Sequence, residues 1–235
     1  MALDFSSPFY PYSKVPNANN TLKGAETIPY QLLRYLLDLP SAEGYAPTDD
    51  NSRPRVRLAK YLWYDTADPL SEALPTPKNK LSLLFNPAQP DINTDELKEK
   101  HPKGYRLFWQ HVREESILTQ QTLVKCYLGR IFDPKPYHTS IGVVFDILVS
   151  SGLETNMTTD VESRSFAIEQ CIRESLSQIN MTGIGAISFQ RYDHADNGSV
   201  SVWTEGSLMG RSLRCSIDWT DAGAEEVDGF CDSCN

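Results

Sequence analysis

The chain has 235 residues, a net charge of −9 and a pI near 4.9. This length is enough for one domain, or for one domain with a sizeable insertion, and it can bury a hydrophobic core. The acidic charge argues against a non-specific nucleic-acid binder, because such proteins need clustered Lys and Arg to displace counterions. An acidic surface can still border a passing duplex, since it repels phosphate and lets the DNA slide.

The N-terminal sequence has no apolar run after a basic start, so we expect no secretory signal. The longest apolar run, residues 141–149, is interrupted by Asp146 and is too short to span a membrane, so we expect no membrane partner. Three of the five cysteines, Cys126, Cys171 and Cys215, fall on apolar faces of predicted elements. That usage indicates reduced thiols that act as small hydrophobes.

The first segment, residues 1–25, is rich in Pro, Asn, Ser and aromatic residues and lacks periodicity. We interpret it as an extended arm. Aromatic rings favour a surface over bulk water, so the arm should pack on its own domain or reach a neighbouring subunit. Its candidate interface residues are Phe5, Phe9 and Tyr10.

Residues 26–220 predict a single α+β domain, which begins with a short leucine-rich helix. Thr27 is its expected N-cap and Pro29 lies in its first turn. Residues 55–64 are compatible with either a helix or a strand, and residues 81–85 predict a strand.

Residues 86–103 contain three prolines and predict an inserted surface loop, with one charged helical turn over residues 95–100. Two strands are expected next, over residues 105–112 and 119–132, joined into a hairpin by a turn at residues 113–116. Pro134 and Pro136 should then break the chain before the central strand.

The central strand is predicted over residues 141–149, and both of its faces carry apolar residues, so we expect both to be covered. A helix is predicted over residues 160–180, opening with the capping-box pattern of Thr159 and Glu162. Its apolar stripe has helical spacing. The stripe contains Val161, Ile168, Cys171, Ile172, Leu176 and Ile179.

Three antiparallel strands follow, over residues 186–192, 199–204 and 211–219, and the Asn197-Gly198 pair predicts a tight hairpin between the first two. The expected fold class is therefore α+β, with a mixed, mostly antiparallel sheet packed by one long amphipathic helix. Residues 221–235 are acidic and predict a flexible, solvated tail.

Few residues have the spacing of a chemical site. Cys231 and Cys234 resemble one half of a zinc site, but no second pair follows, so we expect no metal. Asp65 and Asp68 are three residues apart in a segment typical of a turn. Asp146 is a charge in a covered strand and needs a partner, by default a backbone amide or an arginine. The four histidines, at positions 101, 111, 138 and 194, lack a nucleophile nearby. We therefore expect no catalytic residues and no cofactor.

Phe166 is a further candidate interface residue. On a helical wheel it falls with Glu169 and Arg173, opposite the apolar stripe. Two interpretations stay open: the aromatic arm covers this ring, or the ring contacts another protein.

Five segments carry a resemblance to a known family. They read Arg55-x-x-Leu-Ala-Lys-Tyr-Leu-Trp-Tyr-Asp-Thr-Ala-Asp-Pro-Leu, Gly104-Tyr-Arg-Leu-Phe-Trp, residues 140–149, Ser163-Arg-Ser and Gly183-Ile-Gly. Together, over about residues 50–220, the chain resembles the small neck and tail-terminator proteins at the head–tail junction of tailed bacteriophages.

This resemblance implies a non-enzymatic virion protein that forms a homo-oligomeric ring, commonly a hexamer. Such a ring meets the tail tube and the head connector and lets DNA pass through its lumen without specific binding. It is located in the virion, and in the host cytoplasm during assembly. Two alternatives remain open: a metal-dependent enzyme using Asp146 or the Asp65 and Asp68 pair, and a cytosolic adaptor that binds a peptide by strand addition.

Overall fold

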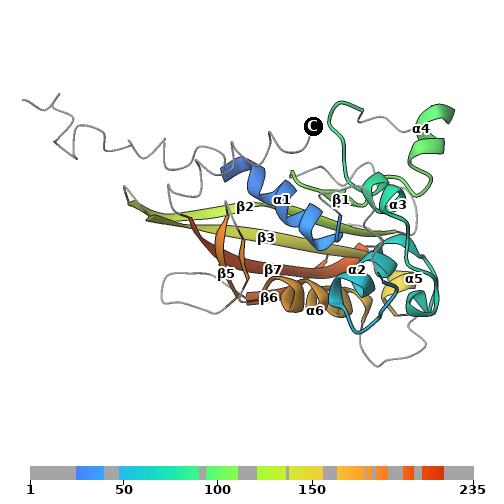
Figure 1. Ribbon diagram of the computed structural model, residues 1–235. Helices are drawn as coiled ribbons and strands as arrows, with labels where there is room; N and C mark the ends of the chain where they lie inside the picture. Colours follow the sequence, from blue (N-terminus) through green and yellow to red (C-terminus); the bar gives the residue numbers. More distant parts are fainter. Residues whose placement is uncertain are drawn as a thin grey trace, which may run out of the picture.

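The computed structural model (Figure 1) has a mixed, mostly antiparallel sheet of seven strands, accompanied by several helices, so the α+β class is confirmed. The residues that the structure describes are 25–39, 48–89, 94–110, 121–135, 138–155, 163–177, 179–181, 184–189, 198–203 and 208–219. The division into arm, domain and tail stays a prediction, because residues 1–24 and 220–235 lie outside the described parts.

Three long strands form the centre of the sheet and run side by side in Figure 1: β2 (Thr122–Lys135), β3 (His138–Ser150) and β7 (Leu208–Trp219). Strand β3 pairs antiparallel with β2 on one edge and with β7 on the other. The predicted central strand is therefore confirmed, and it is longer than expected.

Strand β2 does not stop before Pro134, so the break predicted at that residue was wrong, whereas Pro136 lies outside the described residues. The strand includes Pro134 and pairs with β3 as far as Lys135, opposite His138. The register shifts between Phe132 and Lys135. An irregularity of this kind accommodates a proline, which has no N–H to contribute to a regular ladder.

Strands β5 (Gly185–Ser188) and β6 (Gly198–Trp203) lie end to end along one edge of β7. Ser188 is opposite Ser216, and Gly198 is opposite Arg214. The predicted hairpin between them was wrong, because each pairs with β7 and they do not pair with each other. An Asn-Gly pair favours a turn, but it does not specify which strand receives the returning chain. Strand β4 (Asn180–Met181) pairs with β5.

Strand β1 (Leu107–Phe108) is short and parallel to β2, so the predicted hairpin of residues 105–112 and 119–132 was also wrong. A parallel pair needs a crossover connection instead of a tight turn. Alternation of apolar residues reports which face a side chain occupies, but not the direction of the neighbouring strand. The predicted turn at residues 113–116 lies outside the described residues.

The predicted strand at residues 81–85 was wrong, because a helix occupies its start. In α3 (Pro77–Ser82) the hydroxyl of Thr76 accepts a hydrogen bond from the Asn79 amide at 3.2 Å, and Pro77 takes the first helical position. Beyond it, Leu84 makes an isolated bridge to Leu107. The charged helical turn expected in the insertion is confirmed as α4 (Asp95–Lys100).

Most helical residues of the main core come from α1 (Ile28–Leu36), α2 (Pro54–Trp63) and α6 (Arg164–Leu176). The segment at residues 55–64 is therefore helical. Helix α6 is shorter than the predicted 160–180, because Ser163 has extended backbone geometry and accepts a hydrogen bond from the Phe166 amide. Thr159 and Glu162 lie outside the described residues. The short helix α5 (Ser151–Glu154) follows β3, and 3-10 turns cover Ala25–Thr27 and Pro69–Ser71.

The main core lies between these helices and one face of the sheet. Leucines of α1 and alternate residues of β3 and β7 are almost completely withdrawn from water, as are four residues of the predicted stripe, Ile168, Cys171, Ile172 and Leu176 of α6. The three cysteines of the described residues are free and buried within it, as expected. The other face of the sheet is covered at one end by a second cluster, formed by Tyr105, Phe108, Leu123 and Leu148. Elsewhere it reaches solvent, as at Val200, which is 55% exposed.

At Gly210 the backbone of β7 lies very close to the backbone of β3. A Cβ at this position would lie 1.8 Å from the carbonyl oxygen of Ile147, a backbone atom with little freedom to move. We expect Gly210→Ala to lower the free energy of unfolding by about 2 kcal/mol. Urea unfolding monitored by circular dichroism measures the change.

The matched control is Gly129→Ala in β2. Its Cβ would meet the Val144 Cγ2 methyl group at 3.0 Å, a side-chain contact that can adjust. An equal loss of stability in the two variants would contradict the close backbone approach at Gly210.

Candidate functional site

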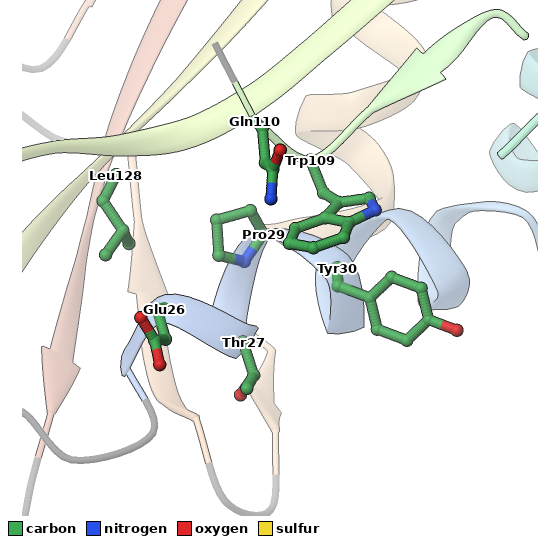
Figure 2. Close-up of a pocket in the computed structure, with 7 residues that line it drawn as sticks. All are labelled: Glu26, Thr27, Pro29, Tyr30, Trp109, Gln110 and Leu128. Carbon is green, nitrogen blue, oxygen red and sulfur yellow. The ribbon is translucent and has the colours of Figure 1, made fainter. Parts of the chain in front are cut away.

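An open groove with a volume of about 670 Å³ lies between α1, the segment after β1 and strand β2 (Figure 2). Its walls are mainly apolar. The lining residues are Glu26, Thr27, Pro29, Tyr30, Trp109, Gln110 and Leu128. Concave, mainly apolar surfaces with a few polar groups at the rim are the usual form of a binding site.

Two aromatic rings dominate this groove. Tyr30 and Trp109 are in edge-to-face contact, with ring centroids 5.9 Å apart and an interplanar angle of 74°. The Trp109 indole N–H donates to the carbonyl oxygen of Phe85 at 3.1 Å, which fixes the orientation of that ring. On the next turn of α1, the Arg34 guanidinium lies 5.8 Å from the Tyr30 ring centroid. Both rings are only half-buried, and Figure 2 shows the indole between Pro29 and Tyr30.

A second hollow, with a volume of about 470 Å³, is also lined by Tyr30 and Trp109. Its other walls come from α3, the segment that follows it, and the end of α4. They include apolar Leu81, which is 50% exposed, and the charged side chains of Lys78 and Lys100. The aromatic pair thus borders both hollows. We call the two hollows together the Tyr30–Trp109 groove.

Neither aromatic residue was a candidate from the sequence. The available signal was local: Tyr30 has Arg34 four residues later on the same helix, and Trp109 directly follows a short strand. Their contact could not be foreseen, because it depends on the parallel pairing of β1 with β2.

Two buried arginines bind the C-terminal end of α2. Arg106 is 2% exposed and donates to both carboxylate oxygens of Asp65, at 2.6 and 2.7 Å, and to the Leu62 carbonyl at 3.0 Å. Arg164 is fully buried and donates to the carbonyl oxygens of Tyr61, Tyr64 and Thr66. These contacts satisfy carbonyl groups that the end of a helix leaves without partners.

The guanidinium of Arg164 stays charged although it is buried. Removal from water lowers the pKa of its guanidinium to about 10, and the nearby Asp65 carboxylate opposes that shift. The group therefore stays protonated at neutral pH. A buried cation with several carbonyl acceptors is a strong structural restraint.

Three of the five segments on which the expected resemblance rests meet at this cluster. Asp65 belongs to segment 55–70, Arg106 to segment 104–109 and Arg164 to segment 163–165. Residues separated by about a hundred positions thus form one polar network that joins α2, β1 and α6. These three segments therefore contain residues that hold the fold together.

The predicted aspartate pair does not converge on an ion. Both oxygens of Asp65 face Arg106, and Lys103 lies 3.9 Å away, whereas Asp68 opens the 3-10 turn at Pro69–Ser71. Its carbonyl oxygen accepts from the Ser71 hydroxyl at 2.9 Å. Within the described residues, no group of three His, Cys, Asp or Glu side chains could hold a metal ion.

Asp146 has a different partner from the one expected. Its carboxylate accepts hydrogen bonds from the Tyr127 hydroxyl at 2.8 Å and the Ser212 hydroxyl at 2.7 Å, one from each neighbouring strand. Burial and the adjacent carboxylate raise the pKa of Tyr127. The expected backbone amide or arginine is replaced by two hydroxyl donors, which are enough to satisfy the charge in this half-buried position.

Phe166 is half-buried, and the Arg211 guanidinium of β7 lies 5.3 Å from its ring centroid. On the same helix, Glu169 is 2% exposed and bonds to Arg173, Arg211 and Ser199 of β6. The charged side of α6 therefore packs on the sheet at this point instead of facing solvent. Phe5, Phe9 and Tyr10 lie outside the described residues, so contact between the arm and Phe166 stays a prediction.

The remaining candidates show no reactive grouping in the described parts. The Nδ1–H of His101 donates to the Ser82 carbonyl at 2.7 Å, and its ring centroid lies 4.6 Å from that of Tyr105, so it has a packing role. His138 begins β3. His111, His194, Cys231 and Cys234 lie outside the described residues.

Comparisons with protein-family models, with curated proteins and with solved structures found no match to this chain. Among the helices that the structure describes, none combines the length and the apolar character needed to cross a bilayer.

The Asp65 carboxylate is the counter-charge of a buried guanidinium, so its removal should be costly. We expect Asp65→Asn to reduce the free energy of unfolding by about 3 kcal/mol, because Arg106 would remain buried without a charged partner. Chemical unfolding at neutral pH measures this loss. The control, Asp68→Asn, should change stability by no more than about 0.5 kcal/mol.

Addition of a divalent cation tests the alternative, in which Asp65 and Asp68 bind a metal ion. If Asp65 and Asp68 held a metal, added Mg²⁺ or Mn²⁺ would raise the melting temperature of the wild type and not of Asp65→Asn. That result would contradict the structural role of Asp65.

Glu169 should make stability depend on acidic pH. Burial alone would raise the pKa of its carboxyl, but hydrogen bonds from Ser199, Arg211 and Arg173 outweigh it, so the pKa lies below its ordinary 4.5. A carboxyl with a lowered pKa stabilises the fold above the unfolded-state pKa, and the contribution disappears as the pH falls through the folded-state pKa. We therefore expect stability from this group to be retained at neutral pH and lost below about pH 4.5.

The test compares unfolding free energies of wild type and Glu169→Gln at neutral and acidic pH. The variant should be less stable by about 2 kcal/mol at neutral pH, and the difference should shrink on acidification. Glu174→Gln is the control, because that side chain is 52% exposed although it pairs with Arg57. A constant difference between wild type and Glu169→Gln at every pH would contradict the assignment.

Proposed function

We propose that this chain is a non-enzymatic subunit of a homo-oligomeric ring, commonly a hexamer, at the head–tail junction of a tailed bacteriophage. The ring terminates the tail tube or joins it to the head connector. The observation that carries a docking role is the Tyr30–Trp109 groove, an open and mainly apolar surface with two half-buried aromatic rings.

The groove has the chemistry of a surface that receives a polypeptide. Tyr and Trp are enriched at protein interfaces, because each offers a large rigid apolar area together with a hydrogen-bonding group. Here the Trp109 N–H is already satisfied by Phe85, so a partner can cover the indole without leaving that donor unpaired. Leu81 adds exposed apolar surface at the same place. Contiguous surfaces of this type mark sites of association.

The other parts of the proposal come from the sequence. The net charge of −9 suits a subunit whose ring borders DNA without retaining it. The resembling segments point to the neck and tail-terminator class, with α6 as the amphipathic helix that backs the sheet. In this proposal the protein acts in the virion, is assembled in the host cytoplasm, and requires no cofactor.

The second candidate is a cytosolic adaptor that binds a peptide. The same groove favours it, because a surface that fits a segment of a neighbouring subunit also fits a segment of another protein. The two candidates differ in self-association: a ring subunit forms oligomers from the purified chain, whereas an adaptor can remain a monomer.

Size-exclusion chromatography with light scattering and electron microscopy should therefore detect closed oligomers of the purified protein, and the protein should be present in particles. We expect Phe166→Ser to weaken this association without unfolding the chain. It removes the contact with Arg211, which costs about 0.5–1 kcal/mol of stability.

Phe189→Ser is the matched control, because Arg173 lies 5.3 Å from the Phe189 ring centroid, the same distance as Arg211 from Phe166. Loss of association in Phe166→Ser alone would support the interface. Unchanged oligomer mass with a lowered melting temperature would reject it. A strictly monomeric protein that is absent from particles would overturn the ring itself.

A further inference from the structure

We propose that the Tyr30–Trp109 groove is a binding site for a polyproline-II peptide, and that its occupant is the segment Ser7–Tyr12 of the same polypeptide chain. This inference does not rest on ring formation or on a virion function, and a neighbouring subunit or another protein that uses the groove must first displace this segment. It rests on the shape of the groove, the sequence of the arm and the point at which the arm joins the fold.

The segment has the spacing that such a groove can recognise. It reads Ser-Pro-Phe-Tyr-Pro-Tyr, so Pro8 and Pro11 are three residues apart. A polyproline-II helix has three residues per turn and rises about 3.1 Å per residue, which places these two rings on one side and about 9 Å apart. Proline-rich segments with this spacing dock on grooves lined by aromatic rings, and their preformed conformation reduces the entropy lost on binding.

The groove offers two hollows for these two rings. The hollows of about 670 and 470 Å³ share Tyr30 and Trp109, which therefore border both. The indole N–H donates to the Phe85 carbonyl, which favours the orientation that leaves the hollow beside the ring open. Each proline can occupy one hollow, with the aromatic pair between them.

Charge and connectivity favour the same direction for the segment. The arm joins the fold at Ala25, and Glu26 and Thr27 line the first hollow, so the C-terminal end of the arm is nearest to that hollow. The N-terminal end then points to the second hollow, where Lys78 and Lys100 lie. Asp4 precedes the proline segment, so in this direction it lies near the lysines of the second hollow. Lys14 follows the segment and lies near Glu26 of the first hollow.

The length of the connection decides which copy supplies the segment. Twelve residues, 13–24, separate Tyr12 from Ala25. A random coil of that length spans about 20 Å, which is enough for the segment to return to the groove that begins at its own attachment point. Such a short tether gives an effective concentration on the order of millimolar. At the lower concentrations of a protein solution, the chain's own arm displaces that of another copy.

Protection of the arm from chymotrypsin tests the proposal on the full-length chain. The enzyme can cut after Phe9 and Tyr12, and a docked segment is cut only when it leaves the groove. We expect Pro8→Ala/Pro11→Ala to be cut at least about tenfold faster than wild type at these positions. Pro16→Ala, outside the segment, is the matched control and should be cut at the wild-type rate. We expect these substitutions to leave the described fold intact, because none of the three positions lies within it.

A charge exchange tests the groove side and the direction together. Lys78 is exposed, so Lys78→Glu should fold normally and should release the arm, seen as cleavage about threefold faster. Asp4→Lys in the same chain should restore protection. The Trp109 indole N–H resonance, assigned by comparison with Trp109→Phe, should shift in Pro8→Ala/Pro11→Ala and not in Pro16→Ala.

Three outcomes would overturn the proposal. Equal cleavage of wild type and Pro8→Ala/Pro11→Ala, with an unshifted Trp109 resonance, would show that the segment does not occupy the groove. Failure of Asp4→Lys to restore protection in Lys78→Glu would refute the direction. Protection that disappears on about hundredfold dilution would show that the segment comes from another copy.

Discussion

Two guanidinium groups withdrawn from water determine how the helices meet the sheet in this protein. Arg106 and Arg164 bind the carbonyl groups at the end of α2, one from the chain that enters β1 and the other from the first turn of α6. A buried cation must keep its acceptors, so these three elements cannot move independently. Trp109 lies three residues beyond Arg106, and the position of the candidate groove therefore depends on the same contacts.

Periodicity was sufficient to predict the elements with one long apolar face. The central strand, the last strand, the leucine-rich first helix and the buried stripe of α6 follow from it, because many consecutive residues repeat the same signal. Periodicity failed where only a few residues determine the type of an element or the strand with which it pairs. Residues 81–85 resembled a strand by composition, but Thr76 and Pro77 start a helix that occupies the first two residues of that segment. Strand direction in β1 and the pairing of β6 depend on neighbours that are distant in sequence.

The candidate site was less accessible to sequence reasoning than the fold. Charged residues are rarely buried, so a sequence gives no reason to place Arg106 and Arg164 in the interior. Asp65 and Asp146 were recognised as residues that need partners, but their partners come from other elements. Nothing in the sequence distinguishes Tyr30 and Trp109 from other aromatic residues. Their contact exists only because α1 and the segment after β1 lie side by side in the fold. Phe166 was found from the helical wheel, whereas the Arg211 contact of its ring was not.

The arrangement of β5 and β6 has a consequence for variation in this protein. Both strands take their register from β7, independently of each other, so the alignment of either strand does not depend on the length of the chain between Ser188 and Gly198. Lengthening the chain between two paired strands costs little additional entropy. We therefore expect a change in the number of residues between these two strands to leave the register of both strands on β7 unchanged.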